Sequence, residues 1–466
     1  MRGHYHRLAA VVLALAAFNL SFRLGSEAVS EWDESLYAIS AWEMGKSGDL
    51  IATTFLGQLD YYNTKPPLNV WLIALSFKAF GTNLVSLRLV SVLSAWLTVA
   101  VLLEWTRRSF GPAIALFAGV VLATSFGFIY VHAGRTADTD ALFTLLVLLT
   151  VVTLSAEQRR PWIRIWLGPL AAAVFLLKGA AVLMPLALVV AVHLGRGSIA
   201  RNLWRPTLAA ALLFALPAAA WSFARWRVDE WRFFERMVNY DLLARSLTVI
   251  EDHPGTPLYY LNILQKHHYD WLVAGAAALM LFPVPGRGLR DRIRTHDGML
   301  VIAWAAITFL IPTMIRTKLA WYLNPFYPAF ALAIGWLVAR GFTSPGTDTR
   351  RAILAAVVGL SFGVAEAKLI WYSYANRDVN HSSQGMLLDH RPQLEGRRVF
   401  RDRWNTAEIF VVDGVIGAEH RVALRLEDFQ RESRPGDCLV TSHRVANAGL
   451  LLVRRDRHDS LYCRVE

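Results

Sequence analysis

The sequence predicts an all-α polytopic membrane protein with long extracytoplasmic loops and a small C-terminal α/β domain. Of its 466 residues, 55% are hydrophobic and 18% are charged, whereas a soluble protein of this length needs more charged surface. Apolar stretches recur from Leu8 to Ile370, and most are long enough to cross about 30 Å of hydrocarbon as helices. Beyond Ala375, short apolar runs such as Val399–Phe400, Ile409–Val412 and Leu439–Thr441 alternate with turn residues, which indicates a small α/β fold.

About 11 transmembrane helices are predicted. The first follows Arg2 and Arg7 like a signal peptide, but no small-residue cleavage site comes after it, and we interpret it as a retained span. The stretch Leu68–Phe80 is short and contains Lys78, which predicts a helix in the outer membrane interface. The spans lie near residues 8–25, 87–104, 112–131, 141–156, 163–177, 180–194, 207–224, 270–284, 299–315, 321–339 and 352–372.

The arginines predict the orientation. With the N-terminus in the cytoplasm, every predicted inner loop carries an excess of arginine, as the positive-inside rule requires. The net charge of +12 therefore reflects cytoplasmic loops, and we expect no nucleic-acid partner. The final span leads the tail to the extracytoplasmic side. The inner arginines are residues 2, 7, 107, 108, 159, 160, 164, 196, 201, 205, 287, 290, 292, 294, 340, 350 and 351.

Two domains are expected. Residues 1–374 form the transmembrane domain, with long outer loops at about 26–86 and 225–269, and residues 375–466 form the extracytoplasmic domain. The only cysteines, Cys438 and Cys463, lie in the tail, so a cysteine-rich metal site is excluded. In an oxidising compartment they could form a disulfide worth roughly 3 kcal/mol, unless they lie too far apart to bond.

Acidic residues cluster at the predicted outer face. Asp33 and Glu34 follow the first span, and Asp138 and Asp140 follow the third. Acidic residues beside a membrane helix often belong only to a solvated loop. Ionisable groups at membrane depth are costly, however, and indicate function by default.

The lysines make a second pattern. By this topology all seven lysines lie at or near the outer face, while the inner loops contain arginine and no lysine. Lys65 precedes the rigid Pro66–Pro67 step. Lys178 and Lys318 lie where spans reach the outer surface, and they either extend to the interface or bind an anionic headgroup, with Arg135 or Arg316 adding a forked contact.

These motifs resemble, in order and spacing, the bacterial aminoarabinose transferase and protein O-mannosyltransferase group of GT-C fold. The resemblance covers about residues 8–340. The motifs are Asp33-Glu34, Lys65-Pro66-Pro67-Leu68, Arg88-Leu89, the segment Arg135 to Asp140-Ala-Leu-Phe, Lys178-Gly179, and Lys318, Tyr322, Pro325 and Tyr327-Pro328.

The resemblance implies a transferase of the bacterial inner membrane that takes a sugar from a polyprenyl-phosphate donor. The acceptor is a lipid such as lipid A, a glycan or a protein, and membrane lipids surround the chain. Asp33 is implied to be central to catalysis, with Glu34 beside it. The implied donor-phosphate residues are Lys65, Arg135, Lys318 and Tyr322, the second acidic motif is Asp138 and Asp140, and further site candidates are Tyr62, Lys178 and His253.

Two positions depart from the aminoarabinose enzymes. Leu36 stands where they have an arginine, which weakens aminoarabinose as the sugar. Thr64 stands where they have a glutamate, which removes one metal ligand. No metal ligand is therefore assigned, and a bound divalent ion is left open.

A direct displacement at the anomeric carbon is expected. Cations would stabilise the leaving phosphate, and Asp33 would act as general base if the acceptor is a hydroxyl. A single displacement implies inversion. The alternative is a membrane transporter or a lipid-linked sugar flippase, which would place ionisable groups near the bilayer midplane rather than at the outer rim.

Overall fold

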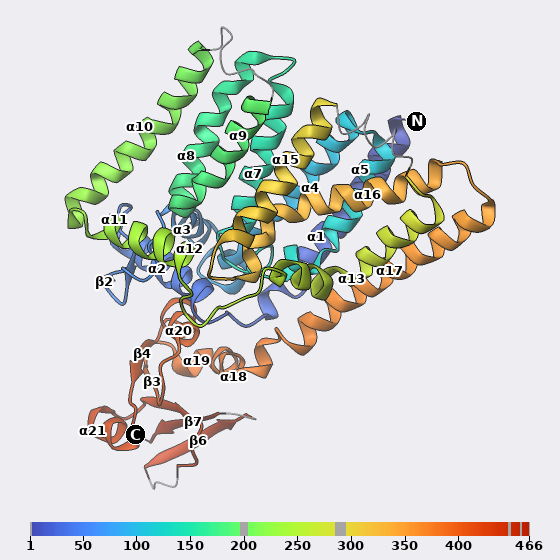
Figure 1. Ribbon diagram of the computed structural model, residues 1–466. Coiled ribbons are helices and arrows are strands. Elements are labelled where there is room, and N and C mark those ends of the chain that lie inside the picture. The colour runs from blue at the N-terminus through green and yellow to red at the C-terminus, as the bar shows by residue number, and fades with distance from the viewer. Residues whose placement is uncertain (1, 196–203, 285–294, 446–448, 457–458, 466) are drawn as a thin grey trace. The chain divides into compact units, whose positions relative to one another are not determined.

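The computed structural model describes residues 2–195, 204–284, 295–445, 449–456 and 459–465 (Figure 1). The predicted inner arginines at 196, 201, 287, 290, 292 and 294 lie outside the described residues. The chain divides into two compact units, which are described separately. The bundle unit comprises Met1–Phe22, Thr64–Asn69 and Ser91–Ile370, and the loop–tail unit comprises Arg23–Asn63, Val70–Val90 and Trp371–Glu466.

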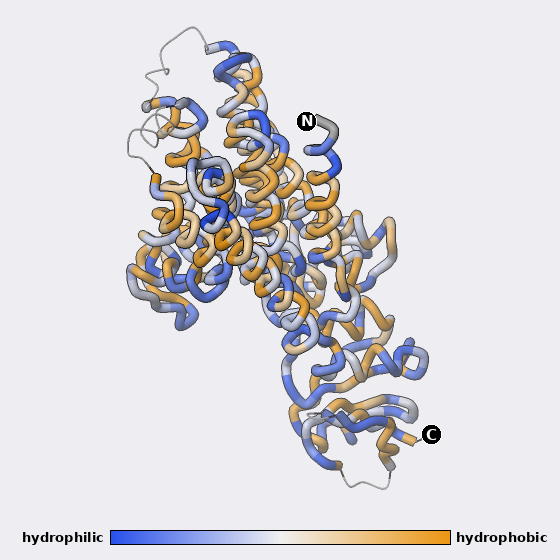
Figure 2. Tube along the Cα trace, turned by 90° about the vertical axis from the view of Figure 1, so that its right-hand side faces the viewer, coloured by the Kyte–Doolittle hydropathy of each residue, from blue (hydrophilic) through white to orange (hydrophobic). Residues whose placement is uncertain are grey.

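The bundle unit is helical, and hydrophobic residues cover most of its long helices (Figure 2). The long elements that lie wholly or mostly in this unit are α1 (Arg2–Ser21), α4 (Leu84–Ser109), α5 (Pro112–Ala123), α7 (Asp140–Ala156), α8 (Leu167–Lys178), α9 (Leu183–Gly195), α10 (Trp204–Asp229), α13 (Tyr259–Leu281), α15 (His296–Met314), α16 (Tyr327–Thr343) and α17 (Asp348–Ala375). Shorter ones are α6 (Phe126–Tyr130), η2 (Pro161–Trp166), η3 (Gly179–Val182), α11 (Arg232–Arg236), η4 (Met237–Ala244), α12 (Arg245–Leu247) and η5 (Ala320–Phe326).

Small residues let these helices approach closely. A Cβ atom on Gly335 of α16 would come within 2.5 Å of the backbone nitrogen of Ala118 in α5. A Cβ atom on Gly168 of α8 would come within 2.1 Å of the carbonyl oxygen of Ala210 in α10. Such crossings are typical of membrane bundles, because lipid supplies no hydrophobic drive and close packing has to hold the helices together.

Seven segments in the described part of the chain are long and apolar enough to cross a membrane. They are His4–Ser26, Leu84–Ser109, Pro161–Gly195, Trp204–Asp229, His296–Met314, Ala320–Thr343 and Asp348–Ala375. Leu68–Phe80, Pro112–Ala123 and Asp140–Ala156 are shorter apolar helices. Every one of the 11 predicted spans overlaps a helix, and the number of membrane crossings stays a prediction.

Two predicted spans differ in detail from the helices observed. The span at 112–131 is interrupted after Ala123, where the Thr124 hydroxyl bonds to the Val120 carbonyl oxygen and accepts a hydrogen bond from Trp271. The spans at 163–177 and 180–194 form a hairpin, because Gly179 turns the chain at φ 51° and Arg164 hydrogen-bonds His193 at 2.7 Å. Helices α8 and α9 have 12 and 13 residues, so each is shorter than the hydrocarbon layer.

In the loop–tail unit, much of the predicted first outer loop folds together with the tail. The loop supplies α2 (Asp33–Ser47), the hairpin β1 (Thr54–Phe55) and β2 (Gln58–Leu59), and most of α3 (Leu68–Phe80). Val29 and Gln384 exchange two hydrogen bonds of 2.8 and 2.9 Å, and Phe77 stacks on Phe410 with ring centroids 5.9 Å apart. The predicted boundary near residue 374 therefore does not separate these segments into different units.

The tail itself is an α/β domain, in agreement with the prediction. Its sheet has the strand order β4-β3-β5-β7-β6, in which β3 is parallel to β4 and β5 and β7 is antiparallel to β5 and β6. Phe400, Ala423, Phe429 and Leu439 form a core beside it. The elements are α18 (Ser383–Asp389), α19 (Arg391–Leu394), β3 (Arg398–Arg401), α20 (Thr406–Ile409), η7 (Phe410–Ile416), β4 (Glu419–Val422), α21 (Leu426–Glu432), β5 (Cys438–Thr441), β6 (Leu450–Arg455) and β7 (Ser460–Arg464).

The two cysteines face each other across neighbouring strands. Cys438 of β5 is the register partner of Cys463 of β7, and the two form a disulfide. The bond therefore cross-links β5 to β7, two neighbouring strands inside the sheet.

Candidate active site

Asp33 opens helix α2 of the loop–tail unit. The preceding residue, Trp32, has φ 67° and ψ −111°, a conformation outside the regions usual for a residue with a side chain. Asp33 and Glu34 are the acidic residues of the first turn, where negative charge interacts favourably with the helix dipole. Asp33 is half-buried, whereas Glu34 is completely buried. The two predicted catalytic carboxylates therefore have different surroundings.

A buried arginine network holds Glu34. The Arg88 guanidinium donates to the two carboxylate oxygens at 2.7 and 3.3 Å, and it also donates to three backbone carbonyl oxygens at 2.8 to 2.9 Å. Arg377 lies 3.6 Å from the same carboxylate. Burial raises the pKa of Glu34, but the two arginines and the hydrogen bonds outweigh burial, so the pKa is lowered overall. This arrangement favours a positioning role for Glu34 over direct proton transfer.

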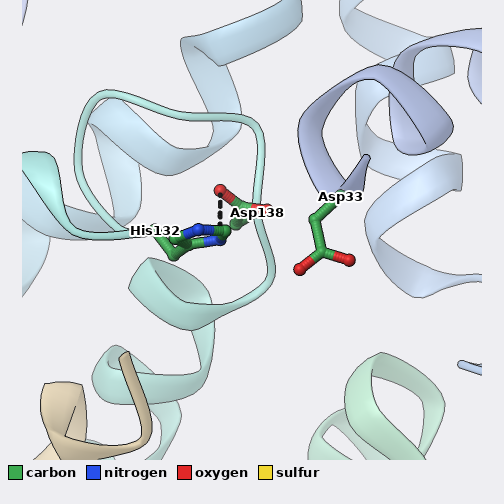
Figure 3. A group of neighbouring side chains, drawn as sticks. All are labelled: Asp33, His132 and Asp138. Carbon is green, nitrogen blue, oxygen red and sulfur yellow. Dashed lines mark ion pairs between the residues drawn. The ribbon is translucent and has the colours of Figure 1, made fainter. Parts of the chain in front are cut away.

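The second acidic motif lies in the bundle unit. Asp140 begins α7, and its carboxylate pairs with the Lys178 ammonium at 2.6 Å. Asp138 is buried, and its carboxylate lies 3.4 Å from Nδ1 of His132 (Figure 3). The His132 ring stacks on Trp321 with centroids 3.8 Å apart. Lys178 thus pairs with the acidic motif inside the bundle unit. This contact is expected if Lys178 and the motif belong to one site.

His132 and Asp138 are also relevant to whether the protein binds a divalent ion, a question that the sequence leaves open. They offer an imidazole nitrogen and a carboxylate oxygen, and divalent transition metals accept both ligand types. Two ligands do not define a metal site, so no metal residue is assigned.

Two predicted phosphate ligands are instead turned toward backbone carbonyl groups. The Arg135 guanidinium donates to the carbonyl oxygens of Asn19 and Phe22 at the end of α1, at 2.6 and 2.5 Å. The Lys318 ammonium donates to three carbonyl oxygens at the end of α15, those of Pro312, Thr313 and Ile315. Cations at helix C-termini are stabilising. Both cations thus bind carbonyl groups at helix ends, and their role as phosphate ligands stays a prediction. Burial also lowers the pKa of Lys318.

A cationic cluster forms around Tyr322 in the bundle unit. Arg245 hydrogen-bonds the Tyr322 hydroxyl, and the Lys65 ammonium interacts electrostatically with the same hydroxyl. Arg245 is oriented from its other side by Asp241 at 3.1 Å and Glu251 at 3.2 Å. Burial lowers the pKa of Arg245, but Tyr322 and the two carboxylates outweigh this and raise it, so the guanidinium keeps its charge. Lys65 and Arg245 therefore both contribute positive charge to the surroundings of the Tyr322 hydroxyl.

Residues 64–69 connect this cluster to the acidic motif. Thr64 donates a hydrogen bond to Asp241, which places the Lys65 backbone beside the Arg245 helix. Asn69 donates to the carbonyl oxygen of Ala137 at 2.9 Å, next to Asp138. A Cβ atom on Gly179 would come within 3.5 Å of Pro66. Motifs that are distant in the sequence thus converge on the Lys-Pro-Pro segment.

The two remaining candidates belong to different units. His253 is exposed, and its carbonyl oxygen accepts a hydrogen bond from the Lys318 amide at 2.9 Å. The residues just before it, Glu251 and Asp252, have positive φ values of 55° and 52°. Tyr62 belongs to the loop–tail unit, where its ring lies 6.0 Å from that of Trp32. Tyr62 is therefore grouped with Asp33 and Glu34.

Sequence reasoning missed Arg245, Asp241 and His132. Arg245 and Asp241 are four residues apart on one helical turn, in the loop already identified as long and rich in charge. Their i, i+4 spacing predicts a salt bridge, but it does not show that the arginine faces the lysine motif. His132 directly follows the third predicted span and has φ 50°, which is unusual for a residue that is not glycine.

Known proteins resemble the chain in sequence. The family described as dolichyl-phosphate-mannose-protein mannosyltransferase matches residues 64–221. An enzyme of Pseudomonas fluorescens, named undecaprenyl phosphate-alpha-4-amino-4-deoxy-L-arabinose arabinosyl transferase 2, is 29% identical over 385 residues, which cover 79% of this chain and 63% of that protein. The corresponding transferase of Pseudomonas aeruginosa strain LESB58 is 30% identical, with 69% and 58% covered. The chain thus matches about three fifths of the length of these relatives.

The fold has solved counterparts as well. ArnT of Cupriavidus metallidurans, crystallised with undecaprenyl phosphate, superposes with a TM-score of 0.72 at 16% identity and covers 99% of this chain and 98% of its own. At this identity the likeness shows the fold. With its candidate spans, the chain is a multi-pass protein of the inner-membrane type. The predicted resemblance is confirmed: in sequence and fold the chain is related to the aminoarabinose transferase and protein O-mannosyltransferase group of GT-C fold.

Proposed function

We propose that the chain is a glycosyltransferase that moves a sugar from a polyprenyl-phosphate donor to a lipid, glycan or protein acceptor at the outer face of the inner membrane. The observation that carries the proposal is that Asp241 links the Lys65 segment to Arg245: it accepts a hydrogen bond from Thr64 and pairs with Arg245 at 3.1 Å, and Arg245 hydrogen-bonds Tyr322. A lysine supplies a point charge for a phosphate, and an arginine supplies a forked donor. The names of the relatives, which include an undecaprenyl phosphate donor, support the same chemistry.

The reaction is a displacement at the anomeric carbon of the donor sugar. The bond to the phosphate oxygen breaks, and the negative charge that develops on the polyprenyl phosphate is stabilised by Lys65 and Arg245. Asp241 and Glu251 hold Arg245 in place, so it needs little reorganisation when this charge forms. Asp33 accepts the proton of an acceptor hydroxyl as general base. One displacement inverts the anomeric configuration.

We assign the donor phosphate to Lys65, Arg245 and Tyr322 rather than to Arg135 and Lys318. The latter two donate to the carbonyl groups that end α1 and α15. Moving either cation to a phosphate would leave those carbonyl groups without their partners, which costs free energy when they are buried. In this assignment Arg135 and Lys318 stabilise the carbonyl ends of α1 and α15.

The donor assignment predicts a loss of lipid-phosphate affinity. Lys65→Ala and Arg245→Ala should each weaken the binding of undecaprenyl phosphate to the reconstituted protein by about 10-fold to 150-fold, because a hydrogen bond to a charged group is worth about 1.5 to 3 kcal/mol. Native mass spectrometry of a lipid titration measures this. The exposed Lys78 provides a matched control, Lys78→Ala, with unchanged affinity. Parent affinity in both Lys65→Ala and Arg245→Ala would refute the assignment.

For the orientation we propose a cytoplasmic N-terminus and a tail outside the cytoplasm. The arginine-rich predicted inner loops support it. The disulfide between Cys438 and Cys463 adds support, since such bonds persist mainly in oxidising compartments.

The orientation predicts that the disulfide forms in living cells. After alkylation of cells under non-reducing conditions, Cys438 and Cys463 should resist the reagent and become reactive only after reduction, as mass spectrometry of the tail peptides would show. The single change Cys438→Ser is the control, because it must expose the Cys463 thiol. Full alkylation of both thiols in the parent without reductant would contradict an external tail.

A further inference from the structure

The loop–tail unit has an exposed cluster of aromatic rings next to Asp33. Trp32, Tyr62 and Trp404 are 56%, 44% and 49% exposed. Trp32 and Tyr62 have ring centroids 6.0 Å apart, and Trp404 lies 6.0 Å from the ring of Phe55 in β1. Large exposed apolar groups that gather in one place mark interaction sites. We call these four residues the aromatic platform.

Hydrogen bonds join the two ring pairs into one surface. The Trp32 amide donates to the Thr406 hydroxyl at 3.2 Å, and the Asn405 side chain donates to the Glu31 carboxylate at 2.8 Å. These contacts bring the residues that follow Trp404 against the residues on either side of the Glu31–Trp32 bond. The platform is therefore assembled from the first outer loop and the tail, within one compact unit.

Trp32 combines a strained backbone conformation with an exposed ring. Its φ of 67° with ψ −111° is an outlier for a bulky residue, and such strain concentrates at functional sites. Packing does not explain it, because more than half of the side chain is exposed. The next residue is Asp33, the proposed general base, so the Trp32 ring is carried by the residue that precedes this base at the start of α2.

We propose that the aromatic platform binds sugar rings of a glycan-bearing acceptor and presents an acceptor hydroxyl to Asp33. This inference rests on the proposed function and specifies its acceptor as a carbohydrate. The C–H groups on one face of a sugar carry partial positive charge and pack on the negative face of an aromatic ring. The sugar hydroxyls find hydrogen-bonding groups in the chain neighbours of the rings: in Glu31 and Asn405, which hydrogen-bond each other, and in the exposed Arg403, which pairs with Asp459.

The same polar groups argue against a membrane surface as the occupant. Aromatic residues also gather at membrane interfaces, but burial of the platform in lipid would remove the Glu31 carboxylate and the Arg403 guanidinium from water, which is costly for charged groups. A sugar replaces the water around them with hydroxyl groups.

Saturation-transfer NMR on the full chain in nanodiscs tests the proposal. The probe is the pool of water-soluble oligosaccharides released by mild acid from the envelope of the producing organism. The parent should bind components of this pool, and Trp32→Ala and Trp404→Ala should each lower the affinity about tenfold, equal to about 1.4 kcal/mol. Trp32→Phe and Trp404→Phe retain a ring and should keep most of the affinity. Trp162→Ala, at a residue of the bundle unit that is 60% exposed, should change nothing.

Parallel measurements separate this inference from the proposed function. The affinity for undecaprenyl phosphate should be normal in the Trp32 and Trp404 variants, whereas Lys65→Ala should lose it and keep the glycan affinity. If Lys65→Ala binds the lipid phosphate normally, the proposed donor site fails while the platform result stands. No binding of the pool by the parent, or unchanged affinity in both alanine variants, overturns the inference. So does a smaller quenching by brominated lipid in Trp404→Phe than in the parent, since the difference identifies a membrane contact of Trp404, one of 17 tryptophans.

Discussion

Asp33→Asn is expected to lower the rate of sugar transfer by about 10²-fold to 10⁴-fold, the usual contribution of a general base. Asparagine keeps the size of the side chain and part of its hydrogen bonding, but it cannot accept a proton. The rate is measured with reconstituted protein, a polyprenyl-phosphate sugar and the acceptor fraction of the envelope, with the products followed by mass spectrometry. Expression and thermal unfolding should match the parent, because Asp33 is half-buried at a helix start rather than in the core.

The size of this loss also reports on the acceptor. A phosphate acceptor is already ionised and needs no base, so only the orienting contribution would disappear and the drop would be smaller. Asp389→Asn is the matched control, at an exposed aspartate of the same unit, and should transfer sugar at the parent rate. A well-folded Asp33→Asn protein with full activity would remove Asp33 from the mechanism and return attention to the transporter alternative.

Much of the bundle could be predicted because hydropathy acts locally. A helix in lipid must satisfy its own backbone groups, so a long apolar stretch determines the element without knowledge of its neighbours. The prediction was less accurate where a tertiary contact accompanies the end of a helix. Thr124 follows the last residue of α5, and its hydroxyl donates to the Val120 carbonyl oxygen and accepts a hydrogen bond from Trp271. The prediction was also less accurate for the first outer loop, whose folding with the tail depends on contacts such as that of Val29 with Gln384, some 355 residues apart.

The candidate site shows the same contrast between features that the local sequence predicts and features that depend on tertiary contacts. The motifs named Lys65, Tyr322, Asp138 and Asp140 as site candidates, and the structure places all four in the same unit, where contacts of residues 64–69 link their segments. The cations were harder to assign, because their charge can serve either a ligand or the carbonyl end of a helix. Arg135 and Lys318 do the latter. The spacing of Arg245 from Asp241 predicts a salt bridge, but several arginines precede Arg245 in the same loop, and only the fold brings it to Tyr322.

Glu34→Gln is expected to destabilise the protein rather than to abolish its chemistry. The change leaves the Arg88 guanidinium buried without its counter-charge, and breaking a buried ion pair costs about 3 to 5 kcal/mol. The backbone carbonyl groups that Arg88 also binds belong to the loop in front of Asp33, so a modest loss of transfer rate should accompany the loss of stability. Thermal unfolding of the purified protein, together with the rate per folded molecule, measures the two effects separately.

The pH dependence distinguishes this ion pair from a merely steric effect. The folded pKa of Glu34 lies below its usual value of 4.5, so its contribution to stability is complete above about pH 4.5 and is lost as the pH falls through the folded pKa. The difference in melting temperature between the parent and Glu34→Gln should therefore be largest near neutral pH and should shrink on acidification. Glu31→Gln, at an exposed residue on the same loop, should leave the melting temperature nearly unchanged at every pH. A stability difference independent of pH would contradict the buried charge pair, and a Glu34→Gln protein as stable as the parent but as inactive as Asp33→Asn would make Glu34 the catalytic base.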